Sequence, residues 1–270
     1  MNMEKNQSMI SSGILVLKNS RDFINRFPES IEASLHPWRR DSIKRIRSYH
    51  NIYTGKRCFI IGNGPSLRKT DMKKLKNEFT FGMNRIFLMF PELGFKTSFL
   101  VSVNDLVIKQ SKDEFKKVDV PTFISWRARR WLEPRDNLYY LYTTYTGKKF
   151  AKDVTKRMWE GATVTYTCLQ LAFYMGFSKA ILIGVDHSFS TKGEPNITIV
   201  SKGDDLNHFH PGYFGKGFKW QLPDLDTSEI AYWLAGETFQ KNGGEVVDAT
   251  VNGKLTVFPK VNYESLFNET

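Results

Sequence analysis

The sequence predicts an α/β fold, a Rossmann-like and mostly parallel sheet with helices on both faces. Short apolar runs such as 58–61 are bounded by glycine, which is typical of buried parallel strands. Stretches with helical spacing lie between these runs, and strands that alternate with helices indicate a parallel sheet. The chain has 270 residues, of which 41% are hydrophobic, enough for a sizeable core.

The first 54 residues are predicted to form a helical N-terminal extension (1–54). Apolar residues recur there at helical spacing, namely Phe23, Ile24 and Phe27, and then Ile31, Leu35 and Trp38. A second amphipathic stretch follows and carries the basic residues Arg39, Arg40, Lys44, Arg45 and Arg47. Such a stretch either packs on the domain that follows or lies on a membrane surface, and the sequence leaves both open.

The remainder of the chain, 55–270, is predicted to be one Rossmann-like domain. Its strands are expected at six apolar runs, 57–61, 79–83, 98–103, 122–126, 180–185 and 245–247. The clearest helix is expected over 162–175. Another is expected over about 228–241, with Asp226 or Thr227 as its N-cap.

Residues 187–225 break the alternation of strands and helices. They are rich in Gly, Pro, Asp and aromatic residues, and they are too numerous for a simple connection. In an α/β fold such a segment is expected over the ligand site. We therefore predict a lid-like insertion over 187–225.

Composition excludes several classes of protein. Cys58 and Cys168 lie in apolar runs, which predicts buried thiols in a reduced, cytoplasmic protein and excludes a disulfide scaffold. No apolar run approaches the roughly 20 residues that span a bilayer. The start of the chain lacks the pattern of a secretion signal.

The formal net charge of +11 is concentrated in two stretches. Residues 109–157 hold 13 Lys and Arg against 6 Asp and Glu, and residues 1–56 hold 10 against 5. The rest of the chain is close to neutral. Basic clusters attract phosphate-bearing partners such as nucleotides, nucleic acid or an anionic membrane surface.

Polar residues directly follow four of the predicted strands. Asn63, Asn84 and Asn104 follow the first three, and Asp186 follows the fifth. Ligands of an open parallel sheet bind outside the carboxyl ends of its strands. An amide offers both a donor and an acceptor, which suits nucleobase edges and ribose hydroxyls. The sequence therefore predicts a nucleotide site at this edge.

The turn after the first strand has features of a phosphate-binding loop. Gly62 and Gly64 would let backbone N–H groups approach an oxyanion, and Ser66 would cap the helix that follows. The turn is not a dinucleotide fingerprint, because Leu67 stands where the third glycine would be. It is not a P-loop either, because no Gly-Lys-Ser/Thr follows.

Residues 59–67, Phe-Ile-Ile-Gly-Asn-Gly-Pro-Ser-Leu, resemble the opening strand and turn of the family 42 bacterial sialyltransferases. Those are metal-independent inverting enzymes that use CMP-sialic acid on a Rossmann-like fold. Similar segments follow in order at Asn84, Asn104, 157–161, 181–186 and 207–209. The resemblance covers about residues 56–250, and the N-terminal extension has no counterpart in it.

A longer phrase, 56–67 together with Asn84-Arg85-Ile86, resembles a second family. This large bacterial family is named for its similarity to an archaeal 6-hydroxymethylpterin diphosphokinase, and it occurs in surface-polysaccharide and flagellin-glycosylation contexts. Its name implies diphosphate transfer, in which magnesium bridges phosphates. The adjacent acidic residues Asp204 and Asp205 leave that magnesium-dependent reading open.

The resemblances imply a glycosyltransferase that moves an acidic sugar, sialic acid-like or Kdo-like, from a CMP-activated donor to a cell-surface glycan. They imply no metal and no bound cofactor, since the CMP-sugar is a co-substrate. A pterin-type diphosphokinase, which would use magnesium, is one alternative. A non-catalytic module that binds anionic glycan or nucleic acid is another, although no nucleic-acid module is recognised in the basic stretch.

The implied chemistry assigns roles to particular residues. His208 is expected to be the general base, with His210 as the fallback, because an imidazole of ordinary pKa, about 6.5, suits that task at neutral pH. Arg157 is expected to stabilise the leaving phosphate. The residues expected to bind the donor nucleotide are Gly62, Asn63, Gly64, Ser66, Asn84, Asn104, Gly161 and Asp186.

One departure from the sialyltransferase pattern lies after Asp186. That family has tyrosines there which steady the leaving phosphate, whereas this chain continues with His187 and Ser188. Ser188 or Tyr213 would have to substitute for them. His187 is expected to have a secondary role in orienting the acceptor.

The expected partners are a nucleotide-sugar donor and a glycan or glycolipid acceptor, with no nucleic acid. The basic N-terminal region is expected to permit a peripheral contact with the membrane. The protein is therefore expected in the cytoplasm or at the inner surface of the membrane. A homo-oligomer is left open.

Overall fold

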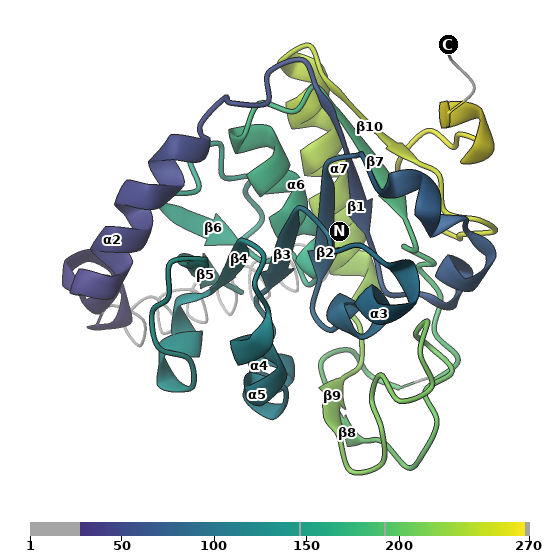
Figure 1. Ribbon diagram of the computed structural model, residues 1–270, viewed down its shortest axis with the longest axis horizontal. Coiled ribbons are helices and arrows are strands. Elements are labelled where there is room, and N and C mark those ends of the chain that lie inside the picture. Colours follow the sequence, from purple (N-terminus) through teal and green to yellow (C-terminus); the bar gives the residue numbers. More distant parts are fainter. Residues whose placement is uncertain (1–27, 146, 192, 268–270) are drawn as a thin grey trace, which may run out of the picture.

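The structure, a computed structural model, describes residues 28–145, 147–191 and 193–267. Its centre is an eight-stranded sheet of order β10-β7-β1-β2-β3-β4-β5-β6, in which neighbouring strands are parallel (Figure 1). The strands are β1 (Arg57–Ile61), β2 (Thr80–Met83), β3 (Phe99–Ser102), β4 (Thr122–Ser125), β5 (Leu138–Thr144), β6 (Arg157–Trp159), β7 (Lys179–Ile183) and β10 (Glu245–Asp248). The predicted Rossmann-like α/β fold is confirmed.

All six predicted strands are present, but the sequence reading missed β5 and β6. β5 lies inside the basic stretch 109–157, and β6 begins at the last residue of that stretch, Arg157. β5 is rich in leucine and tyrosine and is almost fully buried. β6 has three residues, too few for any periodicity to be visible. The sheet therefore extends two strands further than expected.

The order of the strands reverses at β1. The chain adds β2 to β6 on one side of β1, and β7 and β10 on the other side. The loops that follow β1 and β7 therefore leave the sheet in opposite directions. A crevice forms at such a switch point, at the carboxyl ends of the strands.

Helices and 3-10 helices cover both faces of the sheet. The helices are α2 (Pro37–Ile46), α3 (Phe90–Leu93), α4 (Asp105–Gln110), α5 (Lys112–Lys117), α6 (Val164–Tyr174) and α7 (Leu225–Lys241). The 3-10 helices are η1 (Arg47–Tyr49), η2 (Pro65–Lys69), η3 (Met72–Leu75), η4 (Ile86–Met89), η5 (Trp126–Arg130) and η6 (Glu264–Phe267).

Each face of the sheet has its own core, because successive strand residues point to opposite faces. Cys58 and Ile60 of β1 face the layer of α6 and α7, which lie together in Figure 1. Phe59 and Ile61 face the other core, formed with the shorter helices and the insertion. Both cysteines are buried free thiols, as predicted, and burial raises the pKa of each.

The two predicted helices are present with shifted ends. α6 begins at Val164, after Thr163, whose side chain accepts a hydrogen bond from the N–H of Thr165. α7 begins earlier than expected, at Leu225. Its N-cap is Asp224 and not Asp226 or Thr227, because the Asp224 carboxylate accepts the Thr227 N–H. The last part of the predicted insertion is therefore the start of this helix.

α2 covers part of one edge of the sheet. The Ser42 hydroxyl accepts the N–H of Tyr140 (3.1 Å), and Arg45 donates to the carbonyl of Leu138 (2.9 Å). α2 thus contacts the first half of β5, while β6 pairs with the second half. Residues 28–35 are also helical. The apolar positions Phe23, Ile24 and Phe27 lie outside the described residues.

The segment 187–225 carries a small antiparallel hairpin of β8 (Thr198–Val200) and β9 (Lys219–Gln221), near α4 in Figure 1. It is attached to the ends of the strands. The Phe209 N–H donates to the carbonyl of Asn63 (2.8 Å), and the Arg68 guanidinium donates to the carbonyl of Phe209 (2.5 Å). The insertion therefore forms a wall of the crevice.

Among the described residues, none of the helices has both the length and the apolar character needed to cross a bilayer.

Replacing Ser42 with Ala should lower the free energy of unfolding by about 1–3 kcal/mol, because it leaves the buried N–H of Tyr140 without an acceptor. Denaturant unfolding followed by circular dichroism measures this change. The control is Ser34→Ala, an exposed serine on the preceding helical turns, which should change stability by less than about 0.5 kcal/mol. Equal effects of the two variants would contradict the role given to α2.

Candidate functional site

A cavity of about 270 Å³ lies at the carboxyl ends of β1, β2, β3 and β7. Its other walls are the start of α6, the start of α7 and the insertion. The predicted site residues that line it are Gly62, Asn63, Gly64, Asn84, Asn104, Asp186, His187, Ser188 and His208. The strand-end asparagines and His208 thus meet in one cavity, as the sequence predicted.

The three asparagines differ in what their side chains leave for a ligand. Asn104 caps α4, since its Oδ1 accepts the N–H groups of the next helical turn. Asn84 Oδ1 accepts the hydroxyl of Ser102 (2.9 Å). Asn63 donates from Nδ2 to the carbonyl of Met83 (3.2 Å), but its Oδ1 is buried without a partner. A buried acceptor of this kind is costly unless a ligand supplies a donor.

The turn after β1 does not form the phosphate cradle that its glycines predicted. Gly62 and Gly64 use their N–H groups inside the protein, donating to the carbonyls of Ile183 (2.7 Å) and Gly184 (2.9 Å). A Cβ on Gly62 would lie 2.1 Å from the carbonyl oxygen of Gly184, and one on Gly64 would lie 1.8 Å from a carboxylate oxygen of Asp186. The glycines are needed because the loops after β1 and β7 touch.

Ser66 and Asp186 join these two loops. The Ser66 hydroxyl donates to Asp186 Oδ2 (2.7 Å), and its N–H donates to Oδ1 (3.2 Å). Ser66 is therefore not a helix cap facing a phosphate, as we expected, but a buried partner of Asp186. Burial raises the pKa of Asp186, and the two bonds from Ser66 oppose that shift.

The start of α6 is better placed for an anion. Thr163, Val164 and Thr165 line the cavity at the N-terminus of this 11-residue helix. The hydroxyl of Tyr232, from α7, lies 3.2 Å from the Thr163 hydroxyl. Helix N-termini carry partial positive charge and favour bound anions. From the sequence, we predicted Gly161 as the donor-binding residue in this region. The two threonines and Tyr232 were not predicted.

His208 is held by two neighbours. Its Nδ1 lies 2.7 Å from Oδ2 of the buried Asp205, and its ring stacks on Tyr213 with centroids 4.1 Å apart. A carboxylate only accepts, so Nδ1 carries a proton, and in the neutral imidazole Nε2 then has the free lone pair. The fallback residue His210 is exposed and accepts the N–H of Gly212 instead.

Tyr213 is not part of the cavity lining; its ring packs against His208, which does line the cavity. It is fully buried, its hydroxyl accepts the N–H of Arg85 (3.4 Å) and also bonds Asn84, and burial raises its pKa. It therefore cannot replace the tyrosines expected after Asp186. Ser188 does line the cavity, as does His187, whose Nε2 lies 2.8 Å from the carboxylate of Glu229.

Arg157 and Gly161 lie outside the cavity lining. Arg157 is the exposed first residue of β6, with its guanidinium 5.5 Å from the centre of the Tyr142 ring. Gly161 packs tightly, since a Cβ there would lie 2.6 Å from both Ala231 and Tyr166. Neither residue is therefore placed for its expected role. Arg157 was expected at the entrance to the helix, but it belongs to β6, a strand that was not predicted.

A buried ion-pair network that the sequence reading missed forms one wall. Arg127 donates to Glu160 (2.7 Å), to Asp105 (2.8 Å) and to the hydroxyl of Tyr145 (2.7 Å). Burial acts to lower the pKa of Arg127, but Glu160, Tyr145 and Asp105 outweigh it and the pKa is raised. Nothing in the sequence separates Arg127 from the basic residues around it.

The described residues that line the cavity include Glu160, Asp186 and Asp224 but no Lys or Arg. Within the described part of the chain no group of three His, Cys, Asp or Glu side chains could hold a metal ion. Asp205, one of the acidic pair that left magnesium open, bonds His208 instead. The described carboxylates around the cavity therefore do not form a three-ligand metal site.

A family model described as 6-hydroxymethylpterin diphosphokinase MptE-like matches residues 35–192. No curated protein sequence matches the chain. The fold matches the MAf glycosyltransferase from Magnetospirillum magneticum AMB-1 over 83% of this chain, with a TM-score of 0.51 and 15% identity. The chain spans 38% of the length of that enzyme.

A mammalian sialyltransferase, solved in complex with Gal-beta-1-3GalNAc-ortho-nitrophenol, is a more distant match. Its TM-score is 0.39 and its identity 11%, over 87% of this chain and 86% of the other. The likeness to the MAf enzyme shows a shared fold, and the family match confirms the resemblance carried by 56–67.

Replacing Gly64 with Ala should lower the free energy of unfolding by about 1–3 kcal/mol, because the new methyl group would displace Asp186 from the turn. The control is Gly203→Ala in the insertion, where a Cβ meets no atom within 4 Å. Denaturant unfolding of both variants measures the difference. A Gly64 variant as stable as the Gly203 variant would show that the two loops do not pack as described.

Proposed function

The chain belongs to the 6-hydroxymethylpterin diphosphokinase MptE-like family, and we propose that it is a glycosyltransferase, supported by the fold that it shares with the MAf glycosyltransferase. The proposed reaction moves an acidic sugar, sialic acid-like or Kdo-like, from a CMP-activated donor to a glycan or glycolipid acceptor. One observation carries the proposal. A histidine held by a carboxylate and an asparagine with an unpaired acceptor lie in the same cavity at the switch point of the sheet.

The environment of Asn63 supports the proposal that the ligand is a nucleotide with an amino group on its base. Its buried Oδ1 needs a donor, which the amino group of cytosine or a ribose hydroxyl provides. Asn84 and Asn104 lie on the same side of the cavity and complete the proposed nucleotide subsite. Leaving such an acceptor unpaired costs about 1–3 kcal/mol, so a ligand that pairs it gains affinity.

The start of α6 supports a site for the leaving phosphate. With Arg157 outside the lining, neutral donors replace a cation in this role: the helix N-terminus and the hydroxyl pair of Thr163 and Tyr232. Fixed dipoles of this kind stabilise charge that develops in the transition state without having to reorganise. The same donors suit the carboxylate of an acidic sugar.

His208 is the proposed general base. With Nδ1 donating to Asp205, the lone pair on Nε2 can take the proton of the acceptor hydroxyl. The hydroxyl oxygen then forms a bond to the anomeric carbon as the bond from that carbon to the phosphate oxygen breaks. CMP leaves with the electron pair, and the proton stays on His208. Asp205 stabilises the imidazolium that results.

The family name favours a second candidate, a pterin diphosphokinase. That reaction would transfer a diphosphate from ATP to a hydroxymethyl group and would use magnesium. Each of the three carboxylates of the cavity has a partner in the protein: Ser66 for Asp186, Arg127 for Glu160 and the Thr227 N–H for Asp224. We therefore place this candidate second.

Thermal-shift titration with CMP, UMP, and ATP with magnesium and a pterin separates the two candidates. CMP should raise the melting temperature. Asn63→Ala should weaken CMP binding roughly tenfold, because it removes the acceptor for the base or ribose. The exposed Asn77→Ala is the matched control and should bind as the native chain does. Stabilisation by ATP and pterin, and not by CMP, would favour the diphosphokinase.

His208→Gln should abolish sugar transfer while CMP binding stays close to the native value, because the base acts on the acceptor. Asp205→Asn should lower kcat about 10²–10⁴-fold, because the histidine loses the carboxylate that fixes its tautomer and stabilises its charge. The exposed His210→Gln is the control and should keep native turnover. Full activity of the His208 variant would remove the proposed mechanism.

A further inference from the structure

Two basic stretches that are far apart in the sequence lie side by side at one edge of the sheet. The link between them is Arg39, a buried residue of α2, whose guanidinium donates to the carbonyl of Thr155 (2.8 Å). Thr155 lies two residues before the start of the edge strand β6. In Figure 1 α2 and β6 lie next to each other, at the end of the sheet away from β10.

Helical geometry places Arg40 and Lys44 of α2, and Arg47 at the start of the adjoining η1, on the side of this link. Arg40, Lys44 and Arg47 are exposed and recur at i, i+4 and i+7, so they form one strip. The strip lies next to Arg39 on the helix surface, on the side of the helix from which the Arg39 side chain reaches Thr155. Arg45 projects to the other side of α2 and contacts the carbonyls of Asp136 and Leu138.

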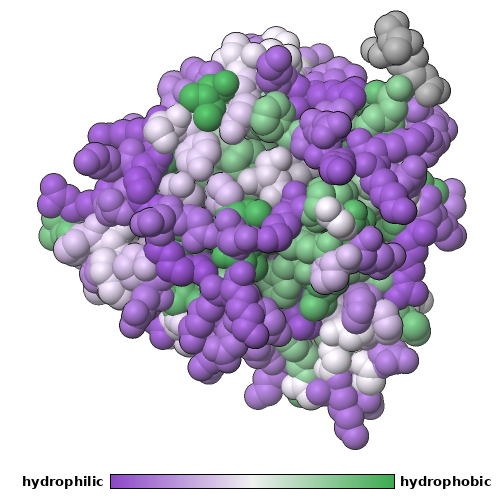
Figure 2. Space-filling model, in the orientation of Figure 1, coloured by the Kyte–Doolittle hydropathy of each residue, from purple (hydrophilic) through white to green (hydrophobic). Residues whose placement is uncertain are grey.

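The second stretch adds three exposed cations, Lys152, Lys156 and Arg157. The carboxylate among them is Asp153, which lies 3.5 Å from the ammonium of Lys156. We call the six cations Arg40, Lys44, Arg47, Lys152, Lys156 and Arg157 the basic edge. Hydrophilic residues cover much of this side of the molecule in Figure 2.

We propose that the basic edge docks the protein on the surface of an anionic lipid bilayer. Lysine and arginine side chains near a membrane are attracted to acidic headgroups, and the attraction grows with their number. The exposed apolar residues beside α2 are aliphatic, Ile31 and Leu35, the latter 68% exposed. Cations combined with aliphatic side chains suit a bilayer interface, whereas single-stranded nucleic acid is bound by cations combined with stacking aromatic rings.

This inference stands apart from the proposed reaction, because binding to vesicles is measured without substrates. The test is flotation of the full chain with vesicles of phosphatidylcholine alone and of equal parts phosphatidylcholine and phosphatidylglycerol. The native chain should float with the anionic vesicles at low salt, and high salt should release it. It should not float with phosphatidylcholine alone.

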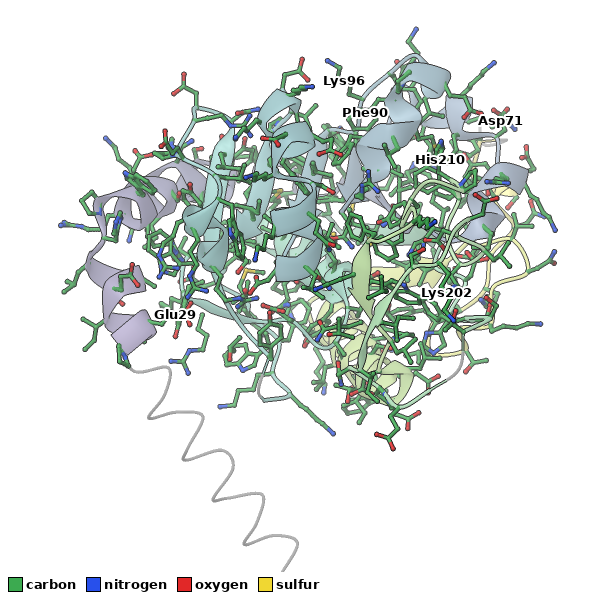
Figure 3. The ribbon with its side chains drawn as sticks, turned by 90° about the horizontal axis from the view of Figure 1, so that it is seen from below. Glu29, Asp71, Phe90, Lys96, Lys202 and His210 are labelled. Carbon is green, nitrogen blue, oxygen red and sulfur yellow. The ribbon has the colours of Figure 1, made fainter. Side chains whose placement is uncertain are left out.

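Two charge-reversal variants define the surface. Arg40→Glu/Lys44→Glu/Arg47→Glu and Lys152→Glu/Lys156→Glu/Arg157→Glu should each weaken vesicle binding on the order of 100-fold. The control is Lys69→Glu/Lys73→Glu/Lys76→Glu, which makes the same change in net charge at the exposed surface of η2 and η3. That surface lies near Asp71, at the end of the molecule opposite Glu29 and α2 (Figure 3). The control variant should keep most of the binding.

Three results would overturn the proposal. The control variant could lose as much binding as the other two, which would make net charge the cause. Neither variant of the basic edge could lose binding. The native chain could prefer a single-stranded oligonucleotide to anionic vesicles in competition, which would assign the basic edge to nucleic acid. Circular dichroism of each variant ensures that only folded protein is compared.

Discussion

The contact between the loop after β1 and the loop after β7 determines the shape of the site. Glycine at 62 and 64 lets the two loops touch, and Ser66 bonds the carboxylate of Asp186 across them. Asn63 lies between these residues, and both its backbone and its side chain contribute to the site. Its carbonyl holds the insertion through the N–H of Phe209, and its side chain lines the cavity. The position of His208 therefore depends on the same turn that places the Asn63 side chain in the cavity lining.

The positive charge of the chain and the chemistry of the cavity are separated in space. The cavity lining, as far as the structure describes it, presents hydroxyls, amides and a helix N-terminus, together with three carboxylates. Arg127 lies behind the wall, where Glu160 and Asp105 neutralise it. Neutral donors in a partly enclosed site interact strongly with an anion, because little water competes with them. A net charge of +11 thus says little about what the cavity binds.

Strand ends were the most predictable part of the site. Asn63, Asn84 and Asn104 each follow an apolar run, and the ends of parallel strands meet at one edge, so their convergence could be inferred. The contacts that a loop makes with other parts of the chain could not be inferred from the sequence. The glycines at 62 and 64 have the composition of a phosphate loop, yet their N–H groups are used by the loop after β7, which lies about 120 residues away in the chain. The contact between Asp205 and His208 depends on an irregular segment that has no periodicity to read.

Both edges of the sheet are blocked against further strands. On one side α2 occupies the first half of β5, and β6 is short and begins with an arginine. On the other side β10 is bridged by the segment around Lys260. An exposed edge is where one chain adds its strands to another, and charges, short strands and covering helices prevent this. Self-association by continuing the sheet from copy to copy is therefore disfavoured.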